Sequence, residues 1–230
     1  MKLVLFDIDG TLLMSAGAGR RAIHRALREV FGDTGPADYW FDGKTDPQIV
    51  RDLMRLAGKD EAHVEREMAE LLRRYVGYLH DELHAPGYHP RPLPGVVALL
   101  DALEARSDVV LGLLTGNIEP GARAKLKAVG IDPDRFRVGA FGSDHADRPE
   151  LPAIARERTR AQLGVQVHGD SIVVIGDTPA DLTCGQSIGA AAIGVATGRF
   201  SVEQLSEYKP MAVFADLSDT RAVVRSIVRS

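Results

Sequence analysis

Short apolar runs recur along the chain and predict the strands of a buried sheet. The first run, Lys2–Phe6 (KLVLF), is followed at once by Asp7 and Asp9. A continuous apolar run, rather than an alternating one, is typical of a parallel strand that is covered on both faces. Further runs of this kind predict strands at Val109–Leu114, Arg135–Phe141, Ser171–Ile175, Ala190–Val195 and Met211–Phe214.

Helical patterns fill the segments between these runs. Pro120 opens one such segment, which stops at Gly130, and the segment Leu151–Leu163 is followed by Gly164. Proline is favoured in the first turn of a helix, and glycine is favoured just past the last turn. Strands that alternate with helices predict an α/β fold with a Rossmann-like, doubly wound parallel sheet.

The stretch after the first strand breaks this alternation, because it contains helical patterns and no strand pattern. Apolar residues such as Val64 and Met68 recur there at the spacing of an amphipathic helix. Asp46 followed by Pro47 predicts the cap and first turn of another helix. The stretch is therefore predicted to be a separate helical unit.

This unit divides the chain into two predicted parts. Residues 1–15 and 89–230 would form the Rossmann-like core, and residues 16–88 would form an inserted α-helical cap subdomain. Glycine and proline concentrate at its two ends, in Ser15–Gly19 and Pro86–Pro94. These segments are the predicted hinges between the parts.

Composition and charge narrow the possible partners. The 230 residues are 45% hydrophobic and 26% charged, and the formal net charge is −4 without a long block of like charge. Such a surface favours neither nucleic acid nor a membrane as a partner. Cys184 is the one cysteine, so no internal disulfide is possible. The first apolar run is too short for a signal peptide or a membrane span. We therefore expect a cytoplasmic protein, monomeric or homodimeric.

Polar side chains gather where the predicted strands end. Three clusters follow strands in this way: Asp7 with Asp9, Thr115 with Gly116 and Asn117, and Asp177 with Asp181. The carboxyl ends of parallel strands meet at one edge of a sheet, so the clusters are expected to converge. Four carboxylates would repel one another without a cation, and oxygen ligands without clustered His or Cys favour Mg²⁺ over zinc. Thr115 and nearby N–H groups could bind an anion. The combination indicates phosphoryl chemistry.

Each cluster alone also has a simpler interpretation. An Asp-x-Asp pair is often solvated or caps a helix, and Thr115 to Asn117 could form a plain turn. Asp177 could simply cap the helix that follows it. The position of all three clusters after strands of one sheet favours the functional interpretation.

These motifs resemble those of a known superfamily. Asp7-Ile8-Asp9-Gly10-Thr11, Leu113-Leu114-Thr115-Gly116-Asn117 and Ile175-Gly176-Asp177-Thr178-Pro179-Ala180-Asp181 look like the first, second and fourth motifs of the haloacid dehalogenase-like (HAD) hydrolases. The likeness spans nearly the whole chain, and the helical insertion resembles the C1-type cap of that superfamily. The nearest branch is the one that contains phosphoglycolate phosphatase-like and β-phosphoglucomutase-like proteins.

The resemblance implies an activity and a role for each matching residue. It implies a Mg²⁺-dependent phosphatase that hydrolyses a small phosphorylated metabolite through an aspartyl-phosphate intermediate. Asp7 would be the nucleophile and Asp9 the general acid and base. The remaining roles would be phosphate contacts from Gly10, Thr11, Thr115, Gly116 and Asn117, and Mg²⁺ ligation by Asp7, Asp177 and the Asp9 carbonyl, with Asp181 behind them.

The third motif departs from the superfamily pattern, which usually places a lysine there. Here the matching stretch, Asp147-Arg148-Pro149-Glu150, offers Arg148. Arginine keeps the positive charge but differs in shape and hydrogen-bonding geometry. Lys125 is the alternative cation, although its place within a helix favours an exposed lysine that forms surface ion pairs.

A segment of the insertion, Trp40-Phe41-Asp42-Gly43-Lys44-Thr45-Asp46, resembles the cap loop that closes over substrate in this branch. Lys44 follows a glycine and precedes a helix start, so it is the predicted cap contact to the leaving group. A solvated loop lysine is the other interpretation. Trp40 and Phe41 are expected in the cap core.

Two other functions remain open. A phosphomutase of the β-phosphoglucomutase type would use the same residues, and a non-catalytic protein could bind a phosphorylated ligand in the same pocket. Dehalogenation is disfavoured, because a halide leaves without a proton and would not need Asp9. Sugar phosphates, phosphoglycolate, nucleotides and pyrophosphate all remain possible substrates.

Overall fold

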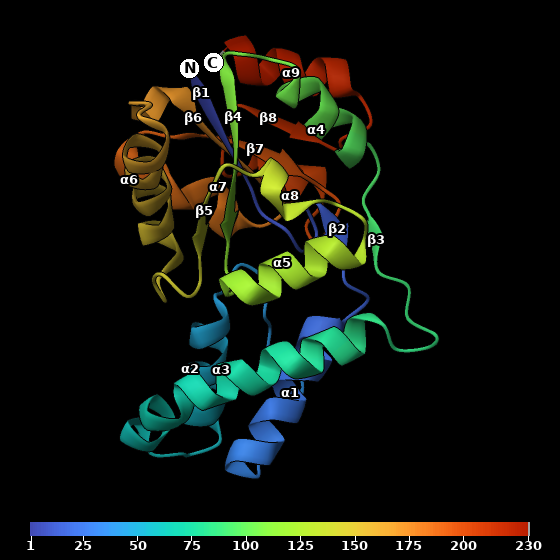
Figure 1. The fold of residues 1–230 in the computed structure, drawn as a ribbon, viewed down its shortest axis with the longest axis vertical. Coiled ribbons are helices and arrows are strands. Elements are labelled where there is room, and N and C mark those ends of the chain that lie inside the picture. Colours follow the sequence, from blue (N-terminus) through green and yellow to red (C-terminus); the bar gives the residue numbers. More distant parts are fainter. Residues whose placement is uncertain (230) are drawn as a thin grey trace.

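A parallel sheet forms the centre of the protein, and the computed structural model describes residues 1–229 (Figure 1). Every neighbouring pair of strands in this sheet runs parallel. The carboxyl ends of the strands therefore lie at one edge. The spatial order is β5 (Val138–Phe141), β4 (Val109–Thr115), β1 (Lys2–Phe6), β6 (Ile172–Gly176), β7 (Ala191–Val195) and β8 (Ala212–Phe214).

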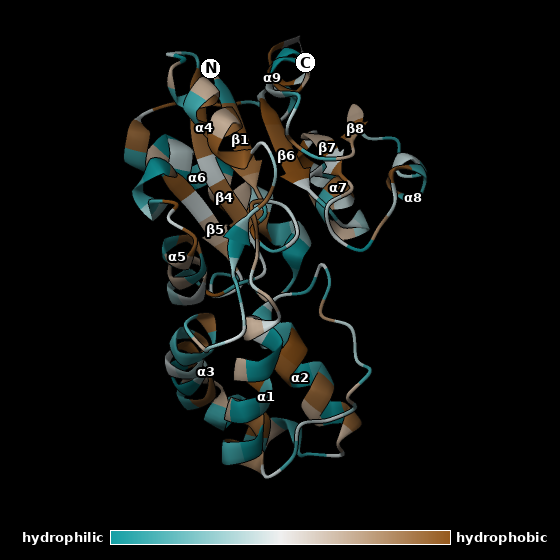
Figure 2. Ribbon diagram, turned by 90° about the vertical axis from the view of Figure 1, so that its right-hand side faces the viewer, coloured by the Kyte–Doolittle hydropathy of each residue, from teal (hydrophilic) through white to brown (hydrophobic). Residues whose placement is uncertain are grey.

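The strands of the sheet consist largely of hydrophobic residues, which are brown in Figure 2, and their side chains are buried on both faces. In β1, Val4 and Phe6 belong to one buried cluster, whereas Leu3 and Leu5 belong to another on the opposite face. Helices α4 (Val96–Glu104), α5 (Glu119–Ala128) and α9 (Thr220–Arg229) contribute to the first cluster. Helices α6 (Leu151–Leu163) and α7 (Pro179–Cys184) contribute to the second, while the short α8 (Val202–Ser206) packs on β7 and β8. The predicted α/β class is confirmed.

The strand bounds differ slightly from those predicted. The strand expected at Arg135–Phe141 begins only at Val138, because Pro133–Arg135 form a short 3₁₀-helix. The last strand begins at Ala212 rather than Met211. Proline favours the helical turn, so the apolar pattern overstated the length of the strand there.

Three helices follow the first strand and form the predicted helical insert. They are α1 (Ala18–Phe31), α2 (Asp46–Leu56) and α3 (Glu61–Leu83). Their apolar faces build a cluster of their own, which Ile118 of the core joins. Thr45, rather than the predicted Asp46, caps α2, since its hydroxyl accepts a hydrogen bond from the Gln48 N–H at 3.2 Å.

The two connections to this insert pair with each other. β2 (Leu13–Met14) and β3 (Arg91–Pro92) form a two-stranded antiparallel ribbon, which the sequence pattern did not predict. The chain therefore enters and leaves the insert at neighbouring positions. The exact division at residues 16–88 remains a prediction, which this arrangement supports. Among residues 1–229, no helix combines the length and apolar character that crossing a membrane requires.

Candidate active site

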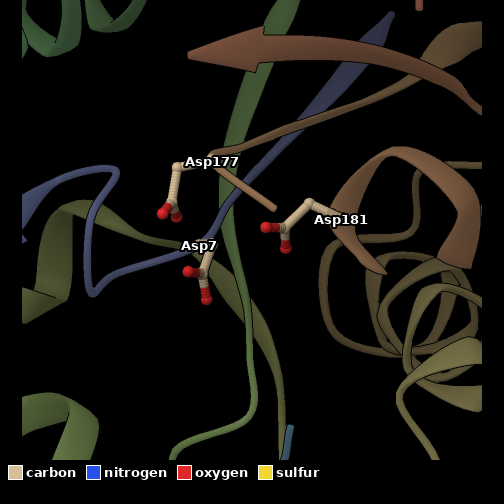
Figure 3. A group of neighbouring side chains, drawn as sticks. All are labelled: Asp7, Asp177 and Asp181. Atoms are coloured by element: carbon tan, nitrogen blue, oxygen red, sulfur yellow. The ribbon is translucent and has the colours of Figure 1, made fainter. Parts of the chain in front are cut away.

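Three buried carboxylates meet at the carboxyl edge of the sheet (Figure 3). Asp7 follows β1, Asp177 follows β6, and Asp181 lies in the first turn of α7. One ligand atom from each residue lies within 4.8 Å of the others. Two of the three polar clusters predicted from the sequence therefore converge at this edge.

A guanidinium group neutralises part of this charge. Arg148 lies in a short 3₁₀-helix, Arg148–Glu150, and its side chain is buried. Its Nη2 donates to Asp7 Oδ1 at 3.0 Å and to Asp181 Oδ1. Burial raises the pKa of Asp7 to about 6, although Arg148 pulls that pKa down. The cation expected in the third motif thus contacts the predicted nucleophile.

A sharp turn separates Asp7 from Asp9. The carbonyl of Ile8 accepts hydrogen bonds from the N–H groups of Thr11, Leu12 and Leu13, and Gly10 has a φ of +80°. A Cβ at Gly10 would overlap the carboxylate of Asp177, so both the backbone angle and the close approach require glycine there. The Thr11 hydroxyl donates to Asp177 Oδ1 at 3.1 Å. Thr11 therefore orients an acid of the site.

The carboxylate of Asp9 faces a second cation. Lys125 Nζ donates to Asp9 Oδ2 at 2.5 Å, Asn117 Nδ2 to the same oxygen at 2.9 Å, and Ser15 Oγ to Oδ1 at 3.0 Å. Burial alone would raise the pKa of Asp9, but Lys125 and these hydrogen bonds hold it below its usual value. Asp9 is therefore ionised at neutral pH in this state.

The expectation that Lys125 is an exposed surface lysine is wrong. Its side chain is 5% exposed, and its Nζ also donates to Asn117 Oδ1 at 2.6 Å. Helix α5 packs against the sheet on one side and against α3 on the other, so it has two buried faces. Lys125 lies on the face of α5 that is turned toward the insert. From the sequence alone, an amphipathic pattern assigns that face to solvent.

The second motif supports the same site. Thr115 is fully buried, and its Oγ1 accepts from the Asn117 N–H at 3.3 Å and from Asn117 Nδ2 at 2.8 Å. The Gly116 carbonyl accepts from the Asp46 N–H at 2.8 Å. A Cβ at Gly116 would overlap the Lys44 carbonyl. Gly116 is thus the point where the loop of the insert touches the core.

Two buried residues at this contact escaped the sequence analysis as site residues. Asp46 Oδ2 accepts from the Ile118 N–H at 2.9 Å, and the Tyr75 hydroxyl donates to the same side chain. Burial raises the pKa of Asp46 to about 6, with Lys125 opposing the change. Asp46 resembled a helix cap in the sequence, and Tyr75 resembled an ordinary apolar-face residue, so neither pattern indicated a contact with the core.

The insert loop departs from prediction at one aromatic residue. Phe41 packs against the insert core as expected, but Trp40 is 47% exposed and lies against the guanidinium of Arg199. The expectation that Trp40 is buried is wrong, because this loop turns toward the core domain. Lys44 Nζ donates to Asp52 Oδ2 at 3.1 Å and to the Tyr39 hydroxyl. Its charge is therefore balanced within the insert.

A cavity of about 250 Å³ lies between the sheet edge and the insert. Asp7, Asp9, Thr115 and Arg148 line it from the core, and residues such as Lys44 line it from the insert. Cavities that hold drug-sized ligands are larger, roughly 300–1,000 Å³. The cavity therefore fits a small ligand.

The chain belongs to the haloacid dehalogenase-like hydrolase family, which matches residues 4–186. The HAD-like recognition from the motifs is confirmed. The protein is a phosphatase of this family.

A phosphoglycolate phosphatase from Rhodospirillum rubrum is 31% identical over 225 residues, which cover 94% of this chain and 88% of the relative. A 5′-nucleotidase from Pseudomonas aeruginosa is 27% identical over 225 residues, covering 97% of this chain and 95% of that protein. The structure of a β-phosphoglucomutase from Clostridium difficile superposes with a TM-score of 0.73, covering 100% of this chain and 98% of that one. At 19% identity, this last likeness shows the fold alone.

Proposed function

We propose that this phosphatase is Mg²⁺-dependent and hydrolyses a small phosphorylated metabolite through an aspartyl-phosphate intermediate. The observation that supports this most directly is the environment of Asp7. Its buried carboxylate has an oxygen within 4.8 Å of a carboxylate oxygen of each of two further aspartates, and it accepts a hydrogen bond from Arg148. Asp9 lies two residues further on, in a separate polar environment. The two acids therefore have separate surroundings, as the separate roles of nucleophile and proton carrier require.

The donor set fits Mg²⁺. Arg148 occupies Asp7 Oδ1, Thr11 occupies Asp177 Oδ1, and the Thr178 N–H and hydroxyl occupy Asp181 Oδ2. Among residues 1–229, no other residue donates a hydrogen bond to the second carboxylate oxygen of Asp7 or of Asp177. Those two residues, with the Asp9 carbonyl, would hold the ion, and Asp181 would contact it indirectly. When bound, Mg²⁺ would offset the charge of the phosphate near the nucleophile.

In the first half of the proposed reaction, a carboxylate oxygen of Asp7 attacks phosphorus. A P–O bond forms to Asp7 while the bond to the leaving alcohol oxygen breaks, and Asp9 gives that oxygen its proton. The low pKa of Asp9 in the ligand-free state is compatible with this step. A phosphate dianion nearby is a like charge, so it raises the pKa of Asp9 and favours the protonated form.

In the second half, Asp9 accepts a proton from water and the resulting hydroxide oxygen attacks phosphorus. The bond to Asp7 breaks, which releases inorganic phosphate and restores the Asp7 carboxylate, while Asp9 regains the proton that it gave to the leaving alcohol. Arg148 and Thr115 are the proposed contacts to the phosphoryl oxygens, supported by the buried position of both side chains beside Asp7. The Gly116 N–H would complete this set, whereas the N–H of Gly10 already donates to the Leu13 carbonyl at 2.9 Å and that of Asn117 donates to Thr115 Oγ1 at 3.3 Å.

Turnover of a simple ester tests the proposal. Wild-type protein should release phosphate from p-nitrophenyl phosphate and from a panel of phosphorylated metabolites, and Asp7→Asn should show no turnover with an unchanged circular dichroism spectrum. Substantial activity of a folded Asp7→Asn protein would remove Asp7 from the role of nucleophile. No release from any ester would favour the non-catalytic binding protein. Interconversion of two sugar phosphates without net phosphate release would favour the mutase.

A further inference from the structure

The cations that line the cavity differ in whether an acid already balances them. Arg148 is paired with Asp7 and Asp181, and Lys125 is paired with Asp9. Lys44, the loop lysine predicted to contact substrate, is paired with Asp52. The Lys44 ammonium would bind a ligand anion less strongly than an unpaired cation would, because its ion pair with Asp52 must first be separated.

Among the cations that line the cavity, Arg20 is the exception, since it forms no ion pair with a carboxylate of the described residues. It lies in the first turn of α1 and lines the cavity from the insert. Its one hydrogen bond runs from Nη1 to the Tyr39 carbonyl at 3.0 Å. Its guanidinium stacks on the Phe41 ring, with Cζ at 4.0 Å from the ring centroid. These two contacts fix the side chain in place without removing its charge.

The groups around Arg20 do not compensate its charge, and the nearest titratable one is neutral. His24 lies one turn further along α1, and burial together with the charges of Arg20 and Arg28 lowers its pKa. Asp42, an acid of the cavity on the insert side, is 3.9 Å from Arg199 of the core. Asp46 faces the Ile118 N–H instead. The insert side of the cavity therefore carries an uncompensated guanidinium that is already held in one orientation.

We propose that Arg20 binds a second anionic group, a carboxylate or phosphate on the alcohol part of the substrate. This inference rests on the proposed phosphatase function, which assigns the transferred phosphoryl group to the core side of the cavity. A planar guanidinium donates two parallel N–H bonds to such a group, and a held guanidinium loses little conformational freedom on binding. The cavity volume of about 250 Å³ favours a compact ester, and Arg20 would select one that carries a second negative group.

Three esters with related skeletons test the proposal. 2-Phosphoglycolate and ethylene glycol bisphosphate carry a second anionic group on the alcohol part and are called the anionic esters. 2-Hydroxyethyl phosphate has an uncharged alcohol part and is called the neutral ester. Wild-type protein should have a higher kcat/KM for an anionic ester than for the neutral one. Arg20→Met removes the guanidinium that stacks on Phe41 and keeps an unbranched apolar side chain at this position. It should lower kcat/KM by about 10- to 100-fold for the preferred anionic ester and by less than about twofold for the neutral one. The anionic ester with the larger loss identifies the group as carboxylate or phosphate.

Arg25→Met is the matched control. Arg25 lies on the same helix, stacks on Tyr78 with Cζ at 3.9 Å, and is absent from the cavity lining. It should leave all three kcat/KM values unchanged, and Arg20→Lys should restore part of the preference. Lys44→Met should change the anionic and neutral esters by the same factor.

A binding measurement separates this inference from the proposed chemistry. In the Asp7→Asn background, calorimetric titration with the same esters should show the same dependence on Arg20 without any turnover. If Arg20→Met weakens the neutral and anionic esters equally, or if the wild type does not prefer an anionic ester, the inference is wrong while the phosphatase function stands. If the Asp7→Asn variant hydrolyses the esters at the normal rate and their binding still depends on Arg20, the proposed function is wrong instead.

Discussion

Replacing Arg148 by methionine removes the cation between two buried acids while keeping most of the side-chain volume. The side chains of Arg148, Asp7 and Asp181 are 5%, 9% and 0% exposed, so water does not screen the carboxylates that remain. Removing one partner of such a pair costs about 3–5 kcal/mol of folding free energy. For a chain of this size, about 3 kcal/mol lowers the melting temperature by about 6–12 °C.

The loss of folding stability caused by Arg148→Met should grow as the pH rises in metal-free buffer. The pKa of Asp7 is raised from its ordinary value to about 6 in the folded protein, mainly by burial. An acid of this kind is more easily ionised when unfolded, so the folded state loses stability as pH rises from about 4 through about 6. Without Arg148 the pKa of Asp7 rises further, and the loss extends to higher pH. The variant should therefore be closest to wild type near pH 5 and furthest from it near pH 8.

Thermal unfolding followed by circular dichroism, at pH 5 and pH 8 with EDTA present, measures both effects. Arg160→Met is the control, since Arg160 and its partner Glu157 are 63% and 61% exposed. Such a pair contributes about 0–1 kcal/mol, so its removal should shift the melting temperature by no more than about 4 °C at either pH. A melting temperature of Arg148→Met within 2 °C of wild type at both pH values, where the prediction is about 6 °C or more, would refute the reasoning.

Two further predictions concern activity. EDTA should abolish phosphate release and added Mg²⁺ should restore it, because Asp7, Asp177 and Asp181 crowd the site; full turnover in metal-free buffer contradicts the proposed cofactor. Lys125→Met should lower kcat by about 10-fold or more for alkyl phosphates and much less for p-nitrophenyl phosphate, because Lys125 orients Asp9 and p-nitrophenolate leaves without a proton. Equal losses on both esters would show that Lys125 does not act through Asp9.

The sheet was predictable because its signal is local. Each buried parallel strand is a short apolar run, and each polar cluster follows such a run within a few residues. The rule that parallel strands end at one edge then brings Asp7 and Asp177 together without any knowledge of side-chain contacts. The insert was predictable as helices for the same reason, since its apolar positions recur at helical spacing.

Contacts between the insert and the core were not predictable. Lys125 is polar on a helix face that a single amphipathic pattern assigns to solvent, and the packing of the insert against α5 buries that face. Asp46 and Thr45 share one helix start, and the sequence does not say which caps the helix and which reaches the core. The availability of Arg20 likewise depends on where Asp52 and Asp42 lie, which is a property of tertiary structure.

The ribbon formed by β2 and β3 has a consequence for how this protein can vary. Leu13 lies opposite Pro92 and Met14 opposite Arg91, so the two ends of the insert are held next to each other by the core domain. Closing a longer or shorter loop at such a junction changes the entropy only slowly, by about 0.6 kcal/mol for each doubling of length. The length of the segment between these strands can therefore change at little entropic cost. A replaced segment would still have to supply the contacts that Asp46 makes to Gly116 and Ile118 of the core.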